Sequence, residues 1–279
     1  VIARPANVVK ELIENSIDAG ATQITITIEQ GGKQLIRVTD NGCGMSQNDA
    51  QLCFAKHATS KITSVDQLPS ITTFGFRGEA LASIAAVAKV TLLTKEKNAL
   101  EGTEVRAQES SITHVTTTAC PEGTDIIVSN LFYNVPARHK FIKARETENR
   151  HIIHSVQAMC LAYPELSFKL IIDDKPILTC LHQESIIERC AQVWDHITAK
   201  HMVPLSATHE KGLAITGAIS NHHWFRYDRS GIFFLVNNRW ITNSHLSRAL
   251  MKGYDNVIPH GKYPIACIQI MINPAHVDI

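Results

Sequence analysis

The sequence predicts an α+β fold in which helices pack against a mainly antiparallel sheet. An amphipathic helix over Ala6–Ala19 is followed directly by two β-rich runs that flank Gly31-Gly32, the pattern of a hairpin. Four further strand-like runs follow one another between residues 89 and 129. A doubly wound parallel sheet would instead alternate strands with helices. The chain contains neither a P-loop motif nor GxGxxG before a helix, which excludes P-loop and Rossmann nucleotide binding.

The first predicted helix has two chemically distinct faces, as judged at about 100° per residue. The apolar face carries Val9, Leu12, Ile13 and Ile17. The polar face carries Glu11, Glu14, Asn15 and Asp18, at spacings i, i+3, i+4 and i+7. Carboxylates at these spacings repel one another by a few tenths of a kcal/mol per pair. A hard cation with oxygen ligands would relieve this repulsion, and an ordinary solvated face would carry the same residues.

The remaining elements are predicted from periodicity and from start and stop signals. Up to a domain boundary near residue 183 they are strands at Gln23–Glu29 and Gln34–Thr39, a helix from a capping box at Ser46 and Asp49 to about Ala55, a helix at Glu79–Val87, strands near 89–94, 102–108, 111–118 and 124–129, a helix at Thr147–Ala162, and a hairpin near 168–172 and 176–179. Beyond the boundary they are a helix near 185–195, strands near 213–219 and 231–236, a helix near 244–254 and a strand at 264–272. The polar stretch from His57 to Gly78 is too long for an ordinary connection, so we expect it to be mobile or functional.

Composition limits the classes of function. A chain of 279 residues with 44% hydrophobic and 19% charged residues predicts a packed core in one large or two ordinary domains. The formal net charge of +1 excludes a globally basic nucleic-acid coat, so any DNA contact must come from a local patch. Seven cysteines without a CxxC pair favour reduced thiols, as in a cytoplasmic or nuclear protein. No apolar run has the length of a membrane span, and the start at Val1 without methionine predicts a fragment of a longer protein.

Two glycine-containing motifs have the chemistry of a nucleotide site. In Asp40-Asn41-Gly42-Cys43-Gly44 the aspartate could accept a hydrogen bond from an exocyclic amine while the glycines let the backbone approach a flat ring. A capped glycine turn would have the same residues. The segment Gly75–Leu81 leads into a helix, whose free amides could bind a phosphate chain. A flexible loop before a helix start is the alternative reading.

Taken in chain order, these pieces resemble the motif series of the GHKL (Bergerat) ATPases: Glu-x-x-x-Asn on a helix, Asp-x-Gly-x-Gly, a glycine-bounded lid and Gly-Thr. That group includes gyrase B subunits, heat-shock chaperones, histidine kinases and MutL mismatch-repair proteins. The strings KHATSKI (56–62), GFRGEALASI (75–84) and LFYNVPAR (131–138) resemble MutL specifically. The resemblance implies a GHKL ATPase α/β sandwich at 1–183, without its N-terminal arm, and a truncated transducer domain similar to ribosomal protein S5 at 184–279.

The resemblance also implies roles for individual residues. Glu11 corresponds to the general base that activates the attacking water, and Asn15 to the residue that holds Mg²⁺ against the triphosphate of ATP. Asp40 corresponds to the adenine reader, with Thr124 as its partner at the base. The residues expected to line the pocket, lid and phosphate loop are Gly44, Thr59, Lys61, Gly75, Gly78, Glu79, Ala80 and Leu81. Glu14 and Asp18 are expected to be supporting or solvated residues.

In the second predicted domain, Phe234–Arg239 resembles the family's strand and turn, with Asn238 where glycine is usual. The family's transducer lysine, which contacts the γ-phosphate, would lie beyond the end of this chain. A cluster of cations at Arg138, Lys140, Lys143 and Arg145 could neutralise DNA phosphates without reading sequence, and a solvated loop is the alternative.

The resemblance therefore implies a MutL-type mismatch-repair protein in which Mg²⁺-dependent ATP binding and slow hydrolysis drive closure of an N-terminal dimer. The implied partners are ATP, DNA, a mismatch sensor of MutS type and a downstream nuclease or helicase, but no membrane. A homodimer is expected, in the bacterial cytoplasm or, for a eukaryotic protein, in the nucleus. The alternatives are a topoisomerase-type or chaperone ATPase, or a nucleotide-binding scaffold without turnover. A scaffold would not need a carboxylate at Glu11.

Overall fold

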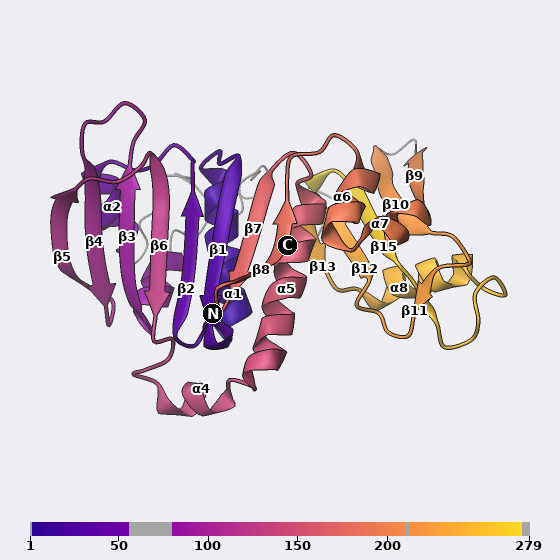
Figure 1. Ribbon diagram of the computed structural model, residues 1–279, viewed down its shortest axis with the longest axis horizontal. Coiled ribbons are helices and arrows are strands. Elements are labelled where there is room, and N and C mark those ends of the chain that lie inside the picture. The colour runs from indigo at the N-terminus through magenta and orange to yellow at the C-terminus, as the bar shows by residue number, and fades with distance from the viewer. Residues whose placement is uncertain (1, 56–79, 210–211, 275–279) are drawn as a thin grey trace. The chain divides into compact units, whose positions relative to one another are not determined.

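The computed structural model describes residues 2–55, 80–209 and 212–274 (Figure 1). Thr59, Lys61, Gly75, Gly78 and Glu79 lie outside the described residues. The chain forms two compact units, each with its own sheet. The first consists of Val1–Val156 with Leu166–Thr179, and the second of Gln157–Glu165 with Cys180–Ile279. The predicted boundary near residue 183 stays a prediction.

The first unit is built on an eight-stranded mixed sheet in the order β5-β4-β3-β6-β2-β1-β7-β8. Its strands are β1 Gln23–Glu29, β2 Leu35–Asp40, β3 Lys89–Lys95, β4 Gly102–Gln108, β5 Ser111–Thr118, β6 Gly123–Ser129, β7 Ser167–Ile172 and β8 Lys175–Cys180. Its helices are α1 Pro5–Asp18, α2 Gln47–Leu52, α3 Ala80–Ala85, α4 Pro136–Phe141 and α5 Arg145–Ala162, the last of which continues into the second unit. Strand β7 is parallel to β1, and the pairings β1–β2, β2–β6, β3–β6, β3–β4 and β4–β5 are antiparallel. The α+β prediction is therefore confirmed.

Helix α1 packs against β1 and β2, behind the sheet in the view of Figure 1. Its start is favoured by Pro5 at the first helical position. Val9, Leu12 and Ile13 are fully buried, as the apolar face predicts, and each such side chain contributes about 1.5–3 kcal/mol of transfer free energy. Of the two alternatives predicted for Glu14, a supporting or a solvated residue, the solvated one is wrong. Glu14 is only 6% exposed, and its carboxylate lies 3.0 Å from the Lys10 ammonium, one turn earlier.

The hairpin β1–β2 brings the end of β2 to the candidate site. Isoleucines alternate with polar residues along β1, so that Ile24, Ile26 and Ile28 are buried. A single 3-10 turn, η1 Gln30–Gly32, joins the strands. Strand β2 then ends at Asp40, directly opposite Thr124 of β6.

The second unit has a five-stranded sheet in the order β13-β12-β15-β10-β9. Its strands are β9 Met202–His209, β10 Leu213–Ser220, β12 Ile232–Val236, β13 Arg239–Ile241 and β15 Ala266–Met271, with the short pair β11 Phe225–Arg226 and β14 Tyr263–Pro264 beside them. Its helices are α6 Ile186–Val193, α7 His196–Lys200 and α8 Ser244–Gly253. Phe234, Ala266 and Ile268 form a core cluster from the adjacent parallel strands β12 and β15. The Asn237-Asn238 turn has positive φ at both residues, which asparagine tolerates.

All seven cysteines are free thiols, as predicted. Among the described residues, no helix is long and apolar enough to cross a membrane.

Candidate functional site

Asp40 is the centre of a buried hydrogen-bond network. Its Oδ2 accepts a hydrogen bond of 2.6 Å from the Ser16 hydroxyl of α1. Its Oδ1 accepts from the Gly42 backbone amide at 2.9 Å and from the Thr124 amide at 3.3 Å. The carboxylate is therefore oriented by three elements before any ligand arrives.

The environment of Asp40 acts on its charge in two directions. Burial raises the pKa of the Asp40 carboxyl, and the hydrogen bonds from Ser16, Gly42 and Thr124 lower it in part. The net shift is upward. A ligand group that donates a hydrogen bond to this carboxylate would help to stabilise its charged form.

Thr94 connects the end of β3 to the same network. Its hydroxyl donates to the Gly123 carbonyl at 3.0 Å, lies 3.1 Å from the Thr124 hydroxyl and accepts from the Met45 amide at 2.9 Å. These bonds hold the segment after the Gly44 turn against the two strands. The ends of β2 and β3 and the start of β6 thus lie together at one end of the central strands of the sheet.

Close backbone contacts at this end of the central strands require glycine. Gly44 has φ +67°, and a Cβ there would lie 2.0 Å from the Lys95 carbonyl oxygen. Gly123 has φ +105°, and a Cβ there would lie 2.1 Å from the Asp40 carbonyl oxygen. The predicted pocket-lining role of Gly44 is therefore accompanied by a packing role.

We expect Gly123→Ala to lower the free energy of unfolding by roughly 3 kcal/mol or more, because it combines positive-φ strain with overpacking against backbone. Gly20→Ala is the matched control, since Gly20 has φ +71° and no atom within 4 Å of the added Cβ. The control should lose only about 1–2 kcal/mol. Denaturant unfolding measures both. Equal losses of unfolding free energy in the two variants would show that the contact between the added Cβ and the Asp40 carbonyl oxygen does not destabilise the fold.

Glu11 and Asn15 lie one turn apart on α1 and are both half-buried. In the described part of the chain, neither side chain has a hydrogen-bonding partner, so both oxygens are available to a ligand. Asn15 supplies an amide oxygen, a hard ligand of the kind that Mg²⁺ accepts, and Mg²⁺ needs only one or two protein ligands beside phosphate and water. No group of three or more His, Cys, Asp or Glu among the described residues could hold a metal alone.

The other predicted residues belong to α3 or lie outside the described part. Ala80 begins α3, and Leu81 is 7% exposed in its first turn. The five predicted residues between 56 and 79 cannot be placed. Sequence reasoning missed Ser16 and Thr94. The available signal for Ser16 was its position on the apolar face of α1, three residues after Ile13 and four after Leu12.

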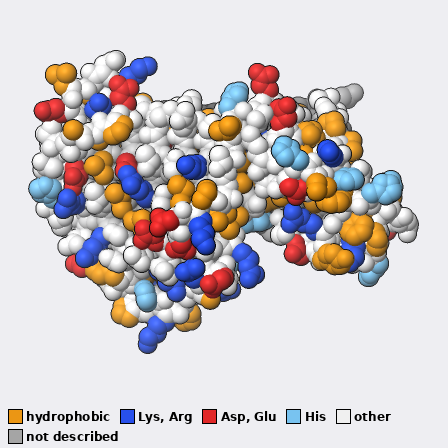
Figure 2. Space-filling model, viewed as in Figure 1, with side chains coloured by type: hydrophobic (Ala, Val, Ile, Leu, Met, Phe, Trp, Pro, Cys, Tyr) orange, Lys and Arg blue, Asp and Glu red, His pale blue; other side chains and the backbone are white. Residues whose placement is uncertain are grey.

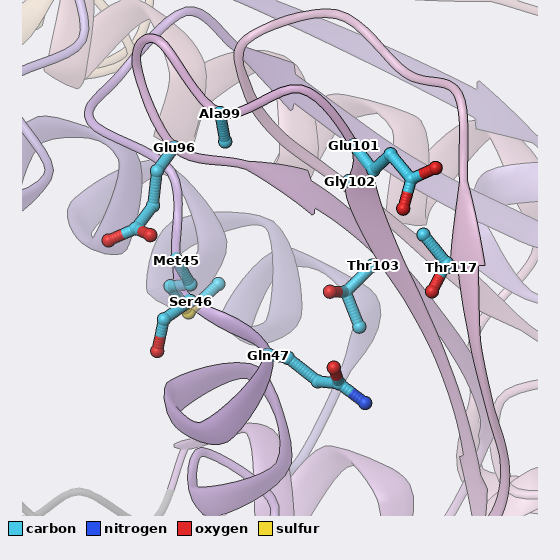
Figure 3. A pocket seen from close by; sticks show the side chains of 9 residues that line it. All are labelled: Met45, Ser46, Gln47, Glu96, Ala99, Glu101, Gly102, Thr103 and Thr117. Atoms are coloured by element: carbon cyan, nitrogen blue, oxygen red, sulfur yellow. The ribbon is translucent and has the colours of Figure 1, made fainter.

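A neighbouring cavity of about 210 Å³ does not coincide with the predicted site. Figure 3 shows its lining, with Glu96 and Glu101 on opposite sides, Thr103 from β4 and Thr117 from β5. None of the predicted nucleotide-site residues lines it. Its two carboxylates would repel a triphosphate.

The predicted DNA-binding cations do not all have the same surroundings. Arg138 and Lys140 are exposed on α4, and Lys143 is exposed just after it. Figure 2 shows basic side chains and hydrophobic groups together at the surface over α4. Arg145 differs, because its Nε lies 3.7 Å from the Asp173 carboxylate and 3.8 Å from that of Glu146. Its charge is partly neutralised within the chain.

Comparison with protein families gives matches in both units. The family described as "Histidine kinase-, DNA gyrase B-, and HSP90-like ATPase" matches residues 3–126. The family described as "DNA mismatch repair protein, C-terminal domain" matches residues 190–279.

Curated relatives are similar along the whole chain. "DNA mismatch repair protein MutL" of Syntrophotalea carbinolica is 40% identical over 279 residues, which are 100% of this chain and 44% of the relative. The protein of the same name from Streptococcus equi subsp. equi is 41% identical over 100% of this chain and 42% of its own length. The chain thus spans less than half the length of these relatives.

Solved structures share the fold. "Aquifex aeolicus MutL ATPase domain complexed with ADP" superposes with a TM-score of 0.73 at 27% identity, covering 98% of this chain and 94% of that one. The "43K ATPase domain of Thermus thermophilus gyrase B" superposes with a TM-score of 0.53 at 13% identity, covering 95% of this chain and 75% of that one, a likeness of fold alone.

Proposed function

Because this chain belongs to the MutL family of DNA mismatch repair proteins and carries its GHKL ATPase domain, we propose that it binds ATP with Mg²⁺ and hydrolyses it slowly. The observation that supports this most strongly is the pre-oriented Asp40 carboxylate between Ser16, Gly42 and Thr124. The test is to measure ATP binding and ATP turnover side by side on this chain and on its Asp40 and Glu11 variants.

Asp40 reads the adenine by accepting a hydrogen bond from the exocyclic amine. Its Oδ1 is occupied by two backbone amides, whereas Oδ2 receives only the Ser16 hydroxyl. A carboxylate oxygen can accept two hydrogen bonds, so Oδ2 has room for one donor from a ligand. Thr124 holds Asp40 in place and supports the base.

Glu11 acts as the general base. Its carboxylate takes a proton from the water that attacks the γ-phosphate, and it must lie within hydrogen-bond reach of that water. Asn15, one turn further along the same face, presents its amide oxygen to Mg²⁺. The metal, when bound, neutralises negative charge on the phosphates. Contact with the phosphate chain is proposed for the residues that the family resemblance assigns to the lid and phosphate loop, namely Thr59, Lys61, Gly75, Gly78, Glu79, Ala80 and Leu81.

ATP binding then acts as a switch. Ordering of the lid and phosphate loop lets two N-terminal halves close on each other, and hydrolysis reopens them. Homodimers of the longer protein pass the state of this switch from a mismatch sensor of MutS type to a downstream nuclease or helicase on DNA.

DNA contact is proposed for the exposed cations Arg138, Lys140 and Lys143, with a smaller part for Arg145. Lys140→Glu/Lys143→Glu should weaken binding to duplex DNA of any sequence and reduce the slope of log affinity against log salt by about 1–2, since each lost phosphate contact removes about 0.9. Fluorescence anisotropy in a chloride series measures both. Lys97→Glu, an exposed lysine after the other end of β3, is the control. An unchanged slope in the double variant would remove α4 from the DNA footprint.

A further inference from the structure

A second cavity of the first unit lies at the end of the central strands opposite Asp40. It has a volume of about 180 Å³ and is lined by Lys33, Lys89, Asn130, Leu131, Tyr133 and His139. Lys89 begins β3 and pairs with Ser129 at the end of β6, whereas Thr94, near the other end of β3, belongs to the candidate ATP site. The two sites are therefore separated by the length of β3.

The cavity concentrates uncompensated positive charge. Two lysines and a histidine from three separate segments line it, and no acidic residue is among its lining residues. In the described part of the chain, neither Lys33 nor Lys89 forms an ion pair. The Glu109 carboxylate, which is not among the lining residues, accepts a hydrogen bond of 3.1 Å from the Tyr133 hydroxyl. Two lysine ammonium groups without an ion-pair partner in the described part of the chain favour an anionic ligand.

The cavity is held by backbone that has little freedom to move. Lys33 follows Gly31 and Gly32, where an added Cβ would lie 3.2 Å from Arg145 backbone atoms and 2.7 Å from the Pro5 side chain. The Lys33 carbonyl accepts from the Leu131 amide at 3.0 Å. On the other side, the Lys89 ammonium lies 5.6 Å from the centre of the Tyr133 ring, a cation–π contact that positions the charge. These contacts arrange the cationic groups before a ligand binds.

The volume of the cavity and the residues around it indicate which class of ligand it binds. A cavity of about 180 Å³ is several times the roughly 30 Å³ share of one water molecule but smaller than the about 300–1,000 Å³ of sites for whole drug-sized ligands. It therefore suits a phosphate group better than a complete nucleotide. His139 also belongs to α4, between the exposed cations Arg138 and Lys140, so the cavity continues the basic surface of that helix.

We propose that this cavity, with Lys33 and Lys89 as its main cations, binds a backbone phosphate of duplex DNA and extends the DNA footprint from α4 across the end of the sheet. The inference rests on the proposed DNA binding. It adds residues that lie outside the predicted cluster and come from two other segments of the chain. Such contacts position a duplex without reading its sequence.

The test compares Lys33→Glu/Lys89→Glu with the parent chain in duplex binding over a chloride series. We expect the double variant to lose at least tenfold in affinity at low salt and its salt slope to become shallower by about 1–2. The neutral variant Lys33→Gln/Lys89→Gln should lose less affinity than the Glu double variant, and its salt slope should change by a similar amount. Lys97→Glu should match the parent. ATP affinity should be unchanged in both Lys33/Lys89 double variants, because Asp40 lies at the other end of the sheet, and this readout also reports correct folding.

The outcomes separate this inference from the proposed function. If the parent binds DNA and the Lys33/Lys89 variants bind equally well with the same slope, the cavity is excluded while α4 keeps its role. If the parent itself does not bind duplex, the proposed DNA binding and this inference both fail. Calorimetric titration with inorganic phosphate tests the other source of the same chemistry. Tight phosphate binding that the variants lose, with duplex binding intact, would overturn the DNA assignment in favour of a small phosphorylated ligand.

Discussion

Glu11→Ala should abolish most ATP hydrolysis while ATP affinity stays within a few-fold of the parent value. A positioned general base contributes about 10²–10⁴-fold to a rate, so turnover should fall by that factor. Binding should persist because the contacts proposed for the base and the phosphates come from other residues. Phosphate release under saturating ATP measures turnover, and titration with a non-hydrolysable analogue in Mg²⁺ measures affinity.

The matched control for Glu11→Ala removes another carboxylate from the polar face of α1. Asp18→Ala removes a charge from the same face, seven residues further along the helix and outside the proposed machinery. It should keep turnover close to that of the parent. Glu14 is unsuitable as a control, because it is buried against Lys10 and its loss would destabilise the helix. If Glu11→Ala loses binding and turnover equally, or keeps both, Glu11 is not the base. Normal turnover would favour a base elsewhere, and absence of turnover in the parent would favour a nucleotide-binding scaffold.

Regular periodicity made much of the fold predictable. Strand β1 was predicted at Gln23–Glu29, residue for residue, because buried isoleucines alternate with polar residues. The family and the GHKL fold were also predicted correctly, because their motifs are short, ordered along the chain and carried by local residue types.

Strand β9 and helix α4 were missed for physical reasons. Strand β9 is an edge strand whose residues are mostly exposed and include Pro204, so it has neither the alternation nor the composition of a central strand. Helix α4 has six residues and none of them is buried, so it has no apolar face. Strand β9 is defined by its pairing with β10, and a single segment of sequence does not contain that information.

The candidate site shows the same limit. Asp40 was found because it stands in a motif, but Ser16, which binds it, is 24 residues away and was not identified. Thr94 was missed similarly, since it reaches Thr124 only across the β3–β6 pairing. The solvated alternative for Glu14 did not account for the ion pair with Lys10, whose long side chain reaches Glu14 along the helix.

Asp40→Asn should weaken ATP binding by about 10–100-fold, or more, without unfolding the chain. A hydrogen bond to a charged group is worth about 1.5–3 kcal/mol, and the amide adds a donor where the adenine amine also donates. The amide should keep its oxygen at the Oδ1 position, where two backbone amides donate to it, because rotation would set its NH₂ against both of them. Its NH₂ then faces Ser16, whose hydroxyl can accept from it while donating to the Leu12 carbonyl at 3.2 Å.

The stability of Asp40→Asn gives a separate check on this assignment. Because burial raises the pKa of the Asp40 carboxyl, its ionisation opposes folding. The parent should therefore lose stability relative to the variant as pH rises through the folded-state pKa of Asp40, and the two should differ least in stronger acid. Asp125→Asn is the matched control on β6, since the Asp125 carboxylate accepts hydrogen bonds from Arg37 and Thr39 and acts on Asp40 only through its charge, the last in order of size among the causes of the raised Asp40 pKa. It should cost stability and leave ATP affinity unchanged. Normal ATP affinity in Asp40→Asn, with the control intact, would show that the adenine is read by another residue.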